Sequence, residues 1–130
     1  MRRERLQGEQ LERYLATVAQ ALVASFAPER ILLFGSFARG DQNRASDLDL
    51  VVITASGLRF CDRIGQALSA CYAASTRLPV EALVYTPEEW RRMLESGSSF
   101  AELVEREGRV LYERESQSPR SATVAPAGPA

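Results

Sequence analysis

Apolar residues along the chain recur with two different spacings, and these spacings predict alternating helices and strands. A helical spacing places the apolar side chains of residues 8–27, and again those of residues 57–74, on one face of each segment. Other stretches are short and apolar throughout, which is typical of strands buried in a sheet. These stretches are residues 31–34, 47–54, 78–86 and, as an expected edge strand, 109–113.

Capping residues predict where two further helices begin. Thr86 is followed by Pro87, and Glu89 completes a capping box, so a helix is expected directly after Thr86. Ser99, with a glutamate three residues later, predicts the start of a short helix that ends at about residue 107. Two short helices should therefore separate the third strand from the last.

The predicted order is helix, strand, helix, strand, helix, strand, helix, helix, strand, where the second helix is only a turn or two within residues 35–40. This order places the chain in the α/β (α+β) class, with one small mixed sheet and helices packed on it. Residues 1–114 form the expected domain. Residues 115–130 are rich in Ser, Pro and Ala, and we expect them to be a disordered tail.

The composition excludes several kinds of chemistry. All 16 basic residues are arginine, and there is no histidine. A Ser-His-Asp triad, a Cys-His pair, a P-loop lysine and a Schiff-base lysine are therefore impossible within this chain. The net charge of −1 argues against a dedicated nucleic-acid binder. Cys61 and Cys71 have no histidine partners for zinc, so we expect free, partly buried thiols.

The chain shows no signal for a membrane or for secretion. No apolar run approaches the roughly 20 residues that a helix needs to span a bilayer. The amino terminus, MRRERLQGEQ, is basic but lacks the apolar stretch of a secretory signal. We therefore expect a cytoplasmic protein with no membrane partner.

Two of the four aspartates, Asp47 and Asp49, lie one residue apart at the start of a predicted strand. Side chains alternate across a strand, so these two share one face while Leu48 and Leu50 point to the other. Two carboxylates this close repel each other unless a cation lies between them. Mg²⁺ prefers oxygen ligands and typically binds one or two carboxylates plus substrate phosphates. The pair suggests a metal site, and the alternative is two solvated residues at a strand entrance.

The dipeptide Gly35-Ser36 directly follows a predicted strand and opens a short helix. Such a turn presents backbone N–H groups to a phosphate, and glycine lets the ligand approach the backbone closely. Alone, it would be read as an ordinary strand-to-helix turn. Together with the aspartate pair on the next strand, it suggests an apparatus for attack on a nucleotide phosphate.

Residues 35–49, GSFARGDQNRASDLD, resemble the nucleotidyltransferase pattern of the DNA polymerase β superfamily, which is Gly-Ser, ten residues, then Asp-x-Asp. The inner segments ARG (38–40) and SDLDL (46–50) look like those of the minimal nucleotidyltransferases of bacteria and archaea. The segment VEREGRVLYE (104–113) is similar to the way these short proteins end. The resemblance implies a polymerase-β-like nucleotidyltransferase fold.

The resemblance also implies the catalytic carboxylates. Asp47 and Asp49 would be catalytic and would ligate two Mg²⁺ ions. The family has a third carboxylate, usually aspartate, on a later strand, and the matching position here is Glu81. Glutamate is one methylene longer, and the alternative is that Glu81 faces solvent on an edge strand.

For the nucleotide, the resemblance implies that Gly35 and Ser36 hold the triphosphate of ATP. Arg39 would neutralise phosphate charge or would simply be an exposed arginine. Phe34, Phe37 and Tyr85 are candidates for stacking on adenine, although such residues more often belong to a core.

Minimal members of this family act as antitoxins that attach AMP to a tyrosine of a HEPN-domain ribonuclease toxin, so the resemblance implies such a partner. One alternative is nucleotidylation of a small molecule such as an aminoglycoside, with a homodimer completing the pocket. Another is a non-catalytic antitoxin that acts by binding alone. Exposed arginines that could serve an interface are Arg2, Arg3, Arg91 and Arg92.

Overall fold

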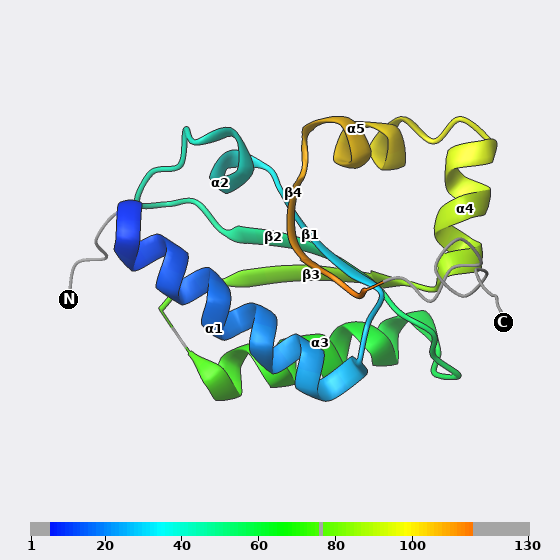
Figure 1. Cartoon of the computed structure of the whole chain (residues 1–130), viewed down its shortest axis with the longest axis horizontal. Coiled ribbons are helices and arrows are strands. Elements are labelled where there is room, and N and C mark those ends of the chain that lie inside the picture. The colour runs from blue at the N-terminus through cyan, green and yellow to red at the C-terminus, as the bar shows by residue number, and fades with distance from the viewer. Residues whose placement is uncertain (1–5, 76, 116–130) are drawn as a thin grey trace, which may run out of the picture.

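The computed structural model describes residues 6–75 and 77–115, and its elements follow the predicted order (Figure 1). The helices are α1 (Gly8–Phe26), α2 (Ser36–Arg39), α3 (Phe60–Ala74), α4 (Pro87–Glu95) and α5 (Ser99–Glu107). The strands are β1 (Arg30–Phe34), β2 (Leu48–Ile53), β3 (Val80–Tyr85) and β4 (Arg109–Glu113). The expected tail from residue 116 on, and the arginines at positions 2 and 3, lie outside the described residues.

The strands form one mixed sheet in the order β3-β2-β1-β4. β1 pairs antiparallel with both β2 and β4, while β2 and β3 are parallel. The parallel pair needs a crossover connection, which α3 supplies. The predicted α+β class with a small mixed sheet is confirmed. β4 lies at one edge, as predicted, and β3 lies at the other.

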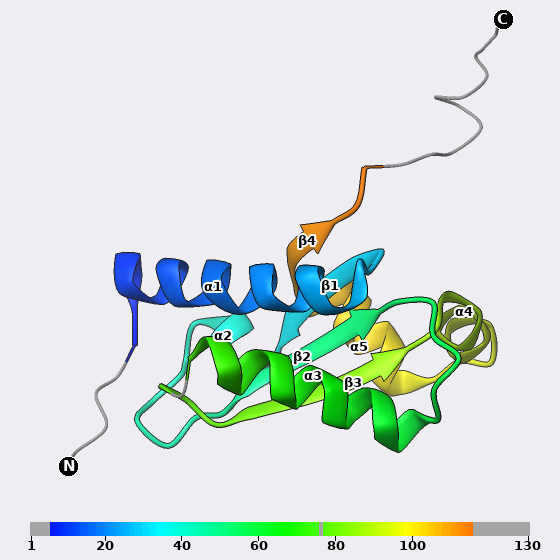
Figure 2. The same cartoon turned by 90° about the horizontal axis from the view of Figure 1, so that it is seen from below.

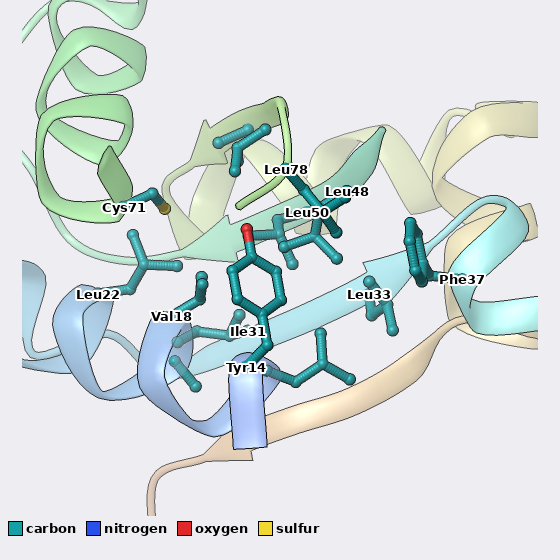
Figure 3. Packing of buried hydrophobic residues seen from close by; sticks show 14 of the residues in the cluster. Tyr14, Val18, Leu22, Ile31, Leu33, Phe37, Leu48, Leu50, Cys71 and Leu78 are labelled. Atoms are coloured by element: carbon teal, nitrogen blue, oxygen red, sulfur yellow. The ribbon is translucent and has the colours of Figure 1, made fainter. Parts of the chain in front are cut away.

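α1 and α3 pack on one face of the sheet, and α4 and α5 pack on the other (Figure 2). The α1–α3 core, shown in Figure 3, includes Tyr14, Val18, Leu22, Ile31, Leu33, Leu48, Leu50 and Cys71. The α4–α5 core consists of Leu32, Val51, Ile53, Trp90, Ala101 and Val104 with their half-buried neighbours. None of the helices in the described ranges combines the length and apolar character that a membrane span requires.

The element ends show which local signals were reliable. The capping box at Thr86 is confirmed: its hydroxyl accepts the Glu89 N–H at 3.2 Å, and the Glu89 carboxylate accepts the Thr86 N–H at 2.9 Å. The prediction of Ser99 as a cap was wrong by one residue, because Ser98 accepts the N–H of Ala101 instead. Both cysteines are free, as predicted, but only Cys71 is buried.

A charged hydrogen-bond network ties α4 and α5 to the sheet. Arg30 of β1 donates two hydrogen bonds to Glu105 of α5, at 2.8 and 3.0 Å. The indole N–H of Trp90 donates to the same carboxylate at 2.6 Å. The bonds from Arg30, and then that from Trp90, hold the pKa of Glu105 below its usual value against the effect of burial. The ionised carboxylate therefore stabilises the fold.

We expect Glu105→Gln to lower the free energy of unfolding at pH 7 by about 2 kcal/mol, because charged hydrogen bonds are replaced by weaker neutral ones. A lowered pKa contributes stability above the unfolded value and loses it as the pH falls through the folded value. The difference from the wild type should therefore shrink at pH 3.5, as measured by urea unfolding. Glu102→Gln, on the exposed face of α5, is the control. A deficit that is equal at both pH values would contradict this account.

Candidate active site

Asp49 lies on the sheet face opposite its neighbours in sequence. Leu48 and Leu50 are completely buried in the α1–α3 core, as the alternation predicted. Asp49 is half-buried and shares the other face with Val51, a member of the α4–α5 core. Asp47 precedes β2 and is exposed. Its carboxylate is still close enough to raise the pKa of Asp49.

Glu81 meets Asp49 across the parallel strands. The two residues are direct partners in the register of β2 and β3, and their side chains hydrogen-bond to each other. Burial, and then the charge and hydrogen bond of Glu81, raise the pKa of Asp49 to about 6. Glu81 does lie exposed on an edge strand, as the alternative held, yet its side chain reaches Asp49.

Gly35 packs against the same carboxylate from the end of β1. Its φ of +77° and ψ of −155° lie in a region that is essentially restricted to glycine. A Cβ at this position would lie 2.5 Å from Asp49 Oδ2, which is far inside van der Waals contact. Ser36 then begins α2, whose first N–H groups have no acceptor within the helix. The start of α2 and the Asp49 carboxylate thus lie side by side.

Arg39 is the last residue of α2 and lies near Asp49. Its side chain is half exposed and donates a hydrogen bond from Nε to Asp41 at 3.2 Å. Its positive charge lowers the pKa of Asp49, opposing the effect of the neighbouring carboxylates. The structure therefore places Arg39 near Asp49, while its guanidinium also forms an ion pair with Asp41.

The loop between α2 and Asp47 is held by polar contacts that the sequence did not reveal. Gln42 is buried, and its amide donates to the carbonyl of Leu6, ahead of α1, at 3.0 Å. Asn43 accepts the N–H of Ala45 at 2.8 Å, while the hydroxyl of Ser46 accepts the N–H of Asn43 at 2.9 Å. A glutamine in a polar connector carries no signal of burial, so only the fold shows this anchor.

The donor set fits a divalent cation. Asp49 and Glu81 offer only oxygen ligands, and a hard cation between them would offset the repulsion of the two carboxylates. Across residues 6–75 and 77–115, no group of three acidic, histidine or cysteine side chains is arranged to hold a metal. Two carboxylates plus substrate phosphates are a usual Mg²⁺ environment. Metal binding by Asp47, Asp49 and Glu81 therefore stays a prediction.

The three aromatic candidates for base stacking lie in different places. Phe37 is buried in the α1–α3 core. Tyr85 lies at the far end of β3 from Glu81, in contact with Phe60 and beside a groove of about 770 Å³ along α4. Phe34 is the direct cross-strand partner of Asp49. Of the three, only Phe34 lies next to Asp49 on the same face of the sheet.

Comparison with known proteins places the chain in a family. Residues 15–112 match the family described as the nucleotidyltransferase domain. A nucleotidyltransferase candidate from Sulfolobus solfataricus superposes with a TM-score of 0.55 at 21% identity, covering 79% of this chain and 80% of that one. A toxin-antitoxin structure with AMP-PNP gives a TM-score of 0.56 at 23% identity, covering 78% and 74%. No curated protein matched.

The chain belongs to the nucleotidyltransferase domain family. Its class of activity is accordingly nucleotidyl transfer, and the structural similarity confirms the fold that the Gly-Ser and Asp-x-Asp pattern implied.

Proposed function

We propose that this protein transfers AMP from Mg-ATP to a hydroxyl group of a partner protein. The observation that carries the proposal is the contact between Asp49 and Glu81 directly beside Gly35. Two carboxylates held together beside a backbone conformation restricted to glycine are costly for stability, and such costs cluster at functional sites. A triphosphate with its cations explains both features.

The sheet order suggests how the substrates would lie. Ser36 and Gly35 follow β1, Asp49 is on the central strand β2, and Glu81 is on the edge strand β3. The β- and γ-phosphates would bind the N–H groups at Gly35 and Ser36, which places the leaving pyrophosphate on the β1 side. The acceptor hydroxyl would then enter at the open β3 edge, opposite the leaving group, as an in-line displacement requires.

In the proposed step the acceptor oxygen bonds to the α-phosphorus while the bond from that phosphorus to the bridging oxygen breaks. Pyrophosphate leaves with the electron pair, and Glu81, exposed at the edge, takes the hydroxyl proton. Bound Mg²⁺, two ions in our proposal, would supply charge neutralisation for the phosphates. Asp47, Asp49 and Glu81 would hold it, and Arg39 would add a further positive charge.

We further propose that the acceptor is a tyrosine of a HEPN ribonuclease toxin and that the protein is its antitoxin. Support comes from the 23% identical fold in a toxin-antitoxin structure with AMP-PNP. The open edge at Glu81 would suit an acceptor carried by a large partner. Transfer to a small molecule, or neutralisation of a toxin by binding alone, are the alternatives that the experiment must separate.

The test is incubation with Mg²⁺ and ATP labelled on either the α- or the γ-phosphate, with and without the product of the neighbouring gene. We expect label from the α-phosphate, and none from the γ-phosphate, to move onto the partner protein. Asp49→Ala should abolish the transfer, while Asp62→Ala, on the exposed face of α3, should not.

Toxin protection in cells separates the remaining alternatives. Full protection by an Asp47→Ala, Asp49→Ala double variant would establish an antitoxin that acts by binding alone. Transfer of label to an aminoglycoside and not to the protein partner would establish the small-molecule alternative.

A further inference from the structure

We infer that Phe34 of β1 and Phe100 of α5 form the surface on which the base of the nucleotide rests. This inference depends on the proposed function, because it assigns the part of the site that would bind the nucleoside. Phe100 carried no signal in the sequence, and its place beside the site comes only from the fold.

Phe34 lies next to Asp49 in the sheet. Its Cα is the direct partner of the Asp49 Cα across the antiparallel pair β1 and β2. The side chain shares the sheet face of Asp49, because Leu32, two residues earlier, belongs to the α4–α5 core. Along this row of the sheet, Asp49 therefore has Glu81 on one side and Phe34 on the other.

Phe100 of α5 extends this aromatic surface from the sheet to the helix that packs on it. Phe100 packs edge-to-face on Phe34, with ring centroids 5.4 Å apart and an interplanar angle of 83°. Both rings are only half-buried, so each keeps part of its surface open. The neighbouring Trp90 packs on Phe100 at 6.3 Å, and it is the single tryptophan of the chain. Its fluorescence can therefore report on events at Phe100.

Two of the directions around Asp49 are already assigned, so the nucleoside must take a third. The phosphates would take the Gly35 side, and the acceptor would need the exposed edge at Glu81. Phe34 adjoins Asp49 on the same sheet face and Phe100 packs on Phe34, so this aromatic pair is the wall left for the base. Planar bases of any kind stack on aromatic rings, so the surface suits a nucleobase with little discrimination among bases.

The test compares the affinities of Mg-ATP and Mg-tripolyphosphate for the full chain by isothermal titration calorimetry. Tripolyphosphate keeps the charge of the nucleotide and lacks its base. We expect Phe100→Leu and Phe34→Leu each to weaken ATP binding about tenfold and to leave tripolyphosphate binding unchanged. ATP, and not tripolyphosphate, should also change the fluorescence of Trp90.

Tyr85→Leu is the matched control. Tyr85 belongs to the same aromatic cluster, packing on Trp90 with centroids 5.4 Å apart, but it lies at the far end of β3. It should cost similar stability and leave both affinities unchanged. Unchanged ATP affinity in both phenylalanine variants, or equal loss of both ligands, would overturn the inference while leaving the proposed function intact. Failure of the wild-type protein to bind either ligand would overturn both.

Discussion

Asp49→Asn should abolish nucleotidyl transfer and at the same time make the protein more stable. We expect the rate of label transfer to fall at least about 1,000-fold, because a neutral amide lacks the negative charge with which the carboxylate would ligate a metal ion. The wild-type carboxyl has a pKa of about 6, raised first by burial and then by Glu81, so ionising it in the folded state is unfavourable. Removing this cost should raise the stability at pH 7 by about 1 kcal/mol once solvent screening is allowed for.

The stability difference between Asp49→Asn and the wild type should depend on pH. A carboxyl whose folded pKa is raised contributes stability that is complete below its unfolded pKa of about 4 and is lost as the pH rises towards 6. Thermal melts without nucleotide or metal should therefore show the variant gaining on the wild type between pH 4 and pH 7. Asp62→Asn, on the exposed face of α3, should show neither effect. A less stable variant that retains transfer would contradict the assignment.

Local patterns in the sequence predicted the elements of this fold well. Apolar patterns predicted the strands and the two long helices, capping residues predicted α4 and α5, and the Gly-Ser turn predicted α2, in the order that the described residues show. The predicted helix ends were less accurate, because a single hydrogen bond can set the residue at which a helix begins or ends. The helix expected from residue 57 begins at Phe60, since the side chain of Ser56 accepts the N–H of Leu58 and holds a turn there.

Which strands pair, and in which direction and register, depends on the whole chain, so no local sequence pattern predicts it. Nothing local in the sequence shows that β2 and β3 are parallel, in a register that pairs Asp49 with Glu81. The resemblance supplied Glu81 as a candidate, and the fold supplied the contact. The buried anchor at Gln42 and the ring of Phe100 likewise depend on segments distant in sequence.

Gly35→Ala should disable the protein by a steric clash, although the substitution replaces no polar side chain. The added Cβ would lie 2.5 Å from Asp49 Oδ2, so the carboxylate or the turn must move. The backbone, at φ +77° and ψ −155°, is also in a region that alanine avoids. We expect the free energy of unfolding to fall by about 3 kcal/mol, of which backbone strain alone supplies roughly 1–3. Label transfer should fall below detection, because the displaced turn no longer presents its N–H groups beside Asp49.

Two further variants separate the clash from the backbone strain. Gly97→Ala has a similar φ of +80°, but nothing lies within 4 Å of its added Cβ, so it should cost only about 1 kcal/mol and leave transfer unchanged. In the double variant Gly35→Ala, Asp49→Ala, the side chain that the new Cβ would strike is gone. Urea unfolding should then show a cost for Gly35→Ala well below its cost in the wild type, a coupling of at least about 1 kcal/mol. Strict additivity would mean that the two residues do not touch, and glycine would be required at this turn by its backbone conformation alone.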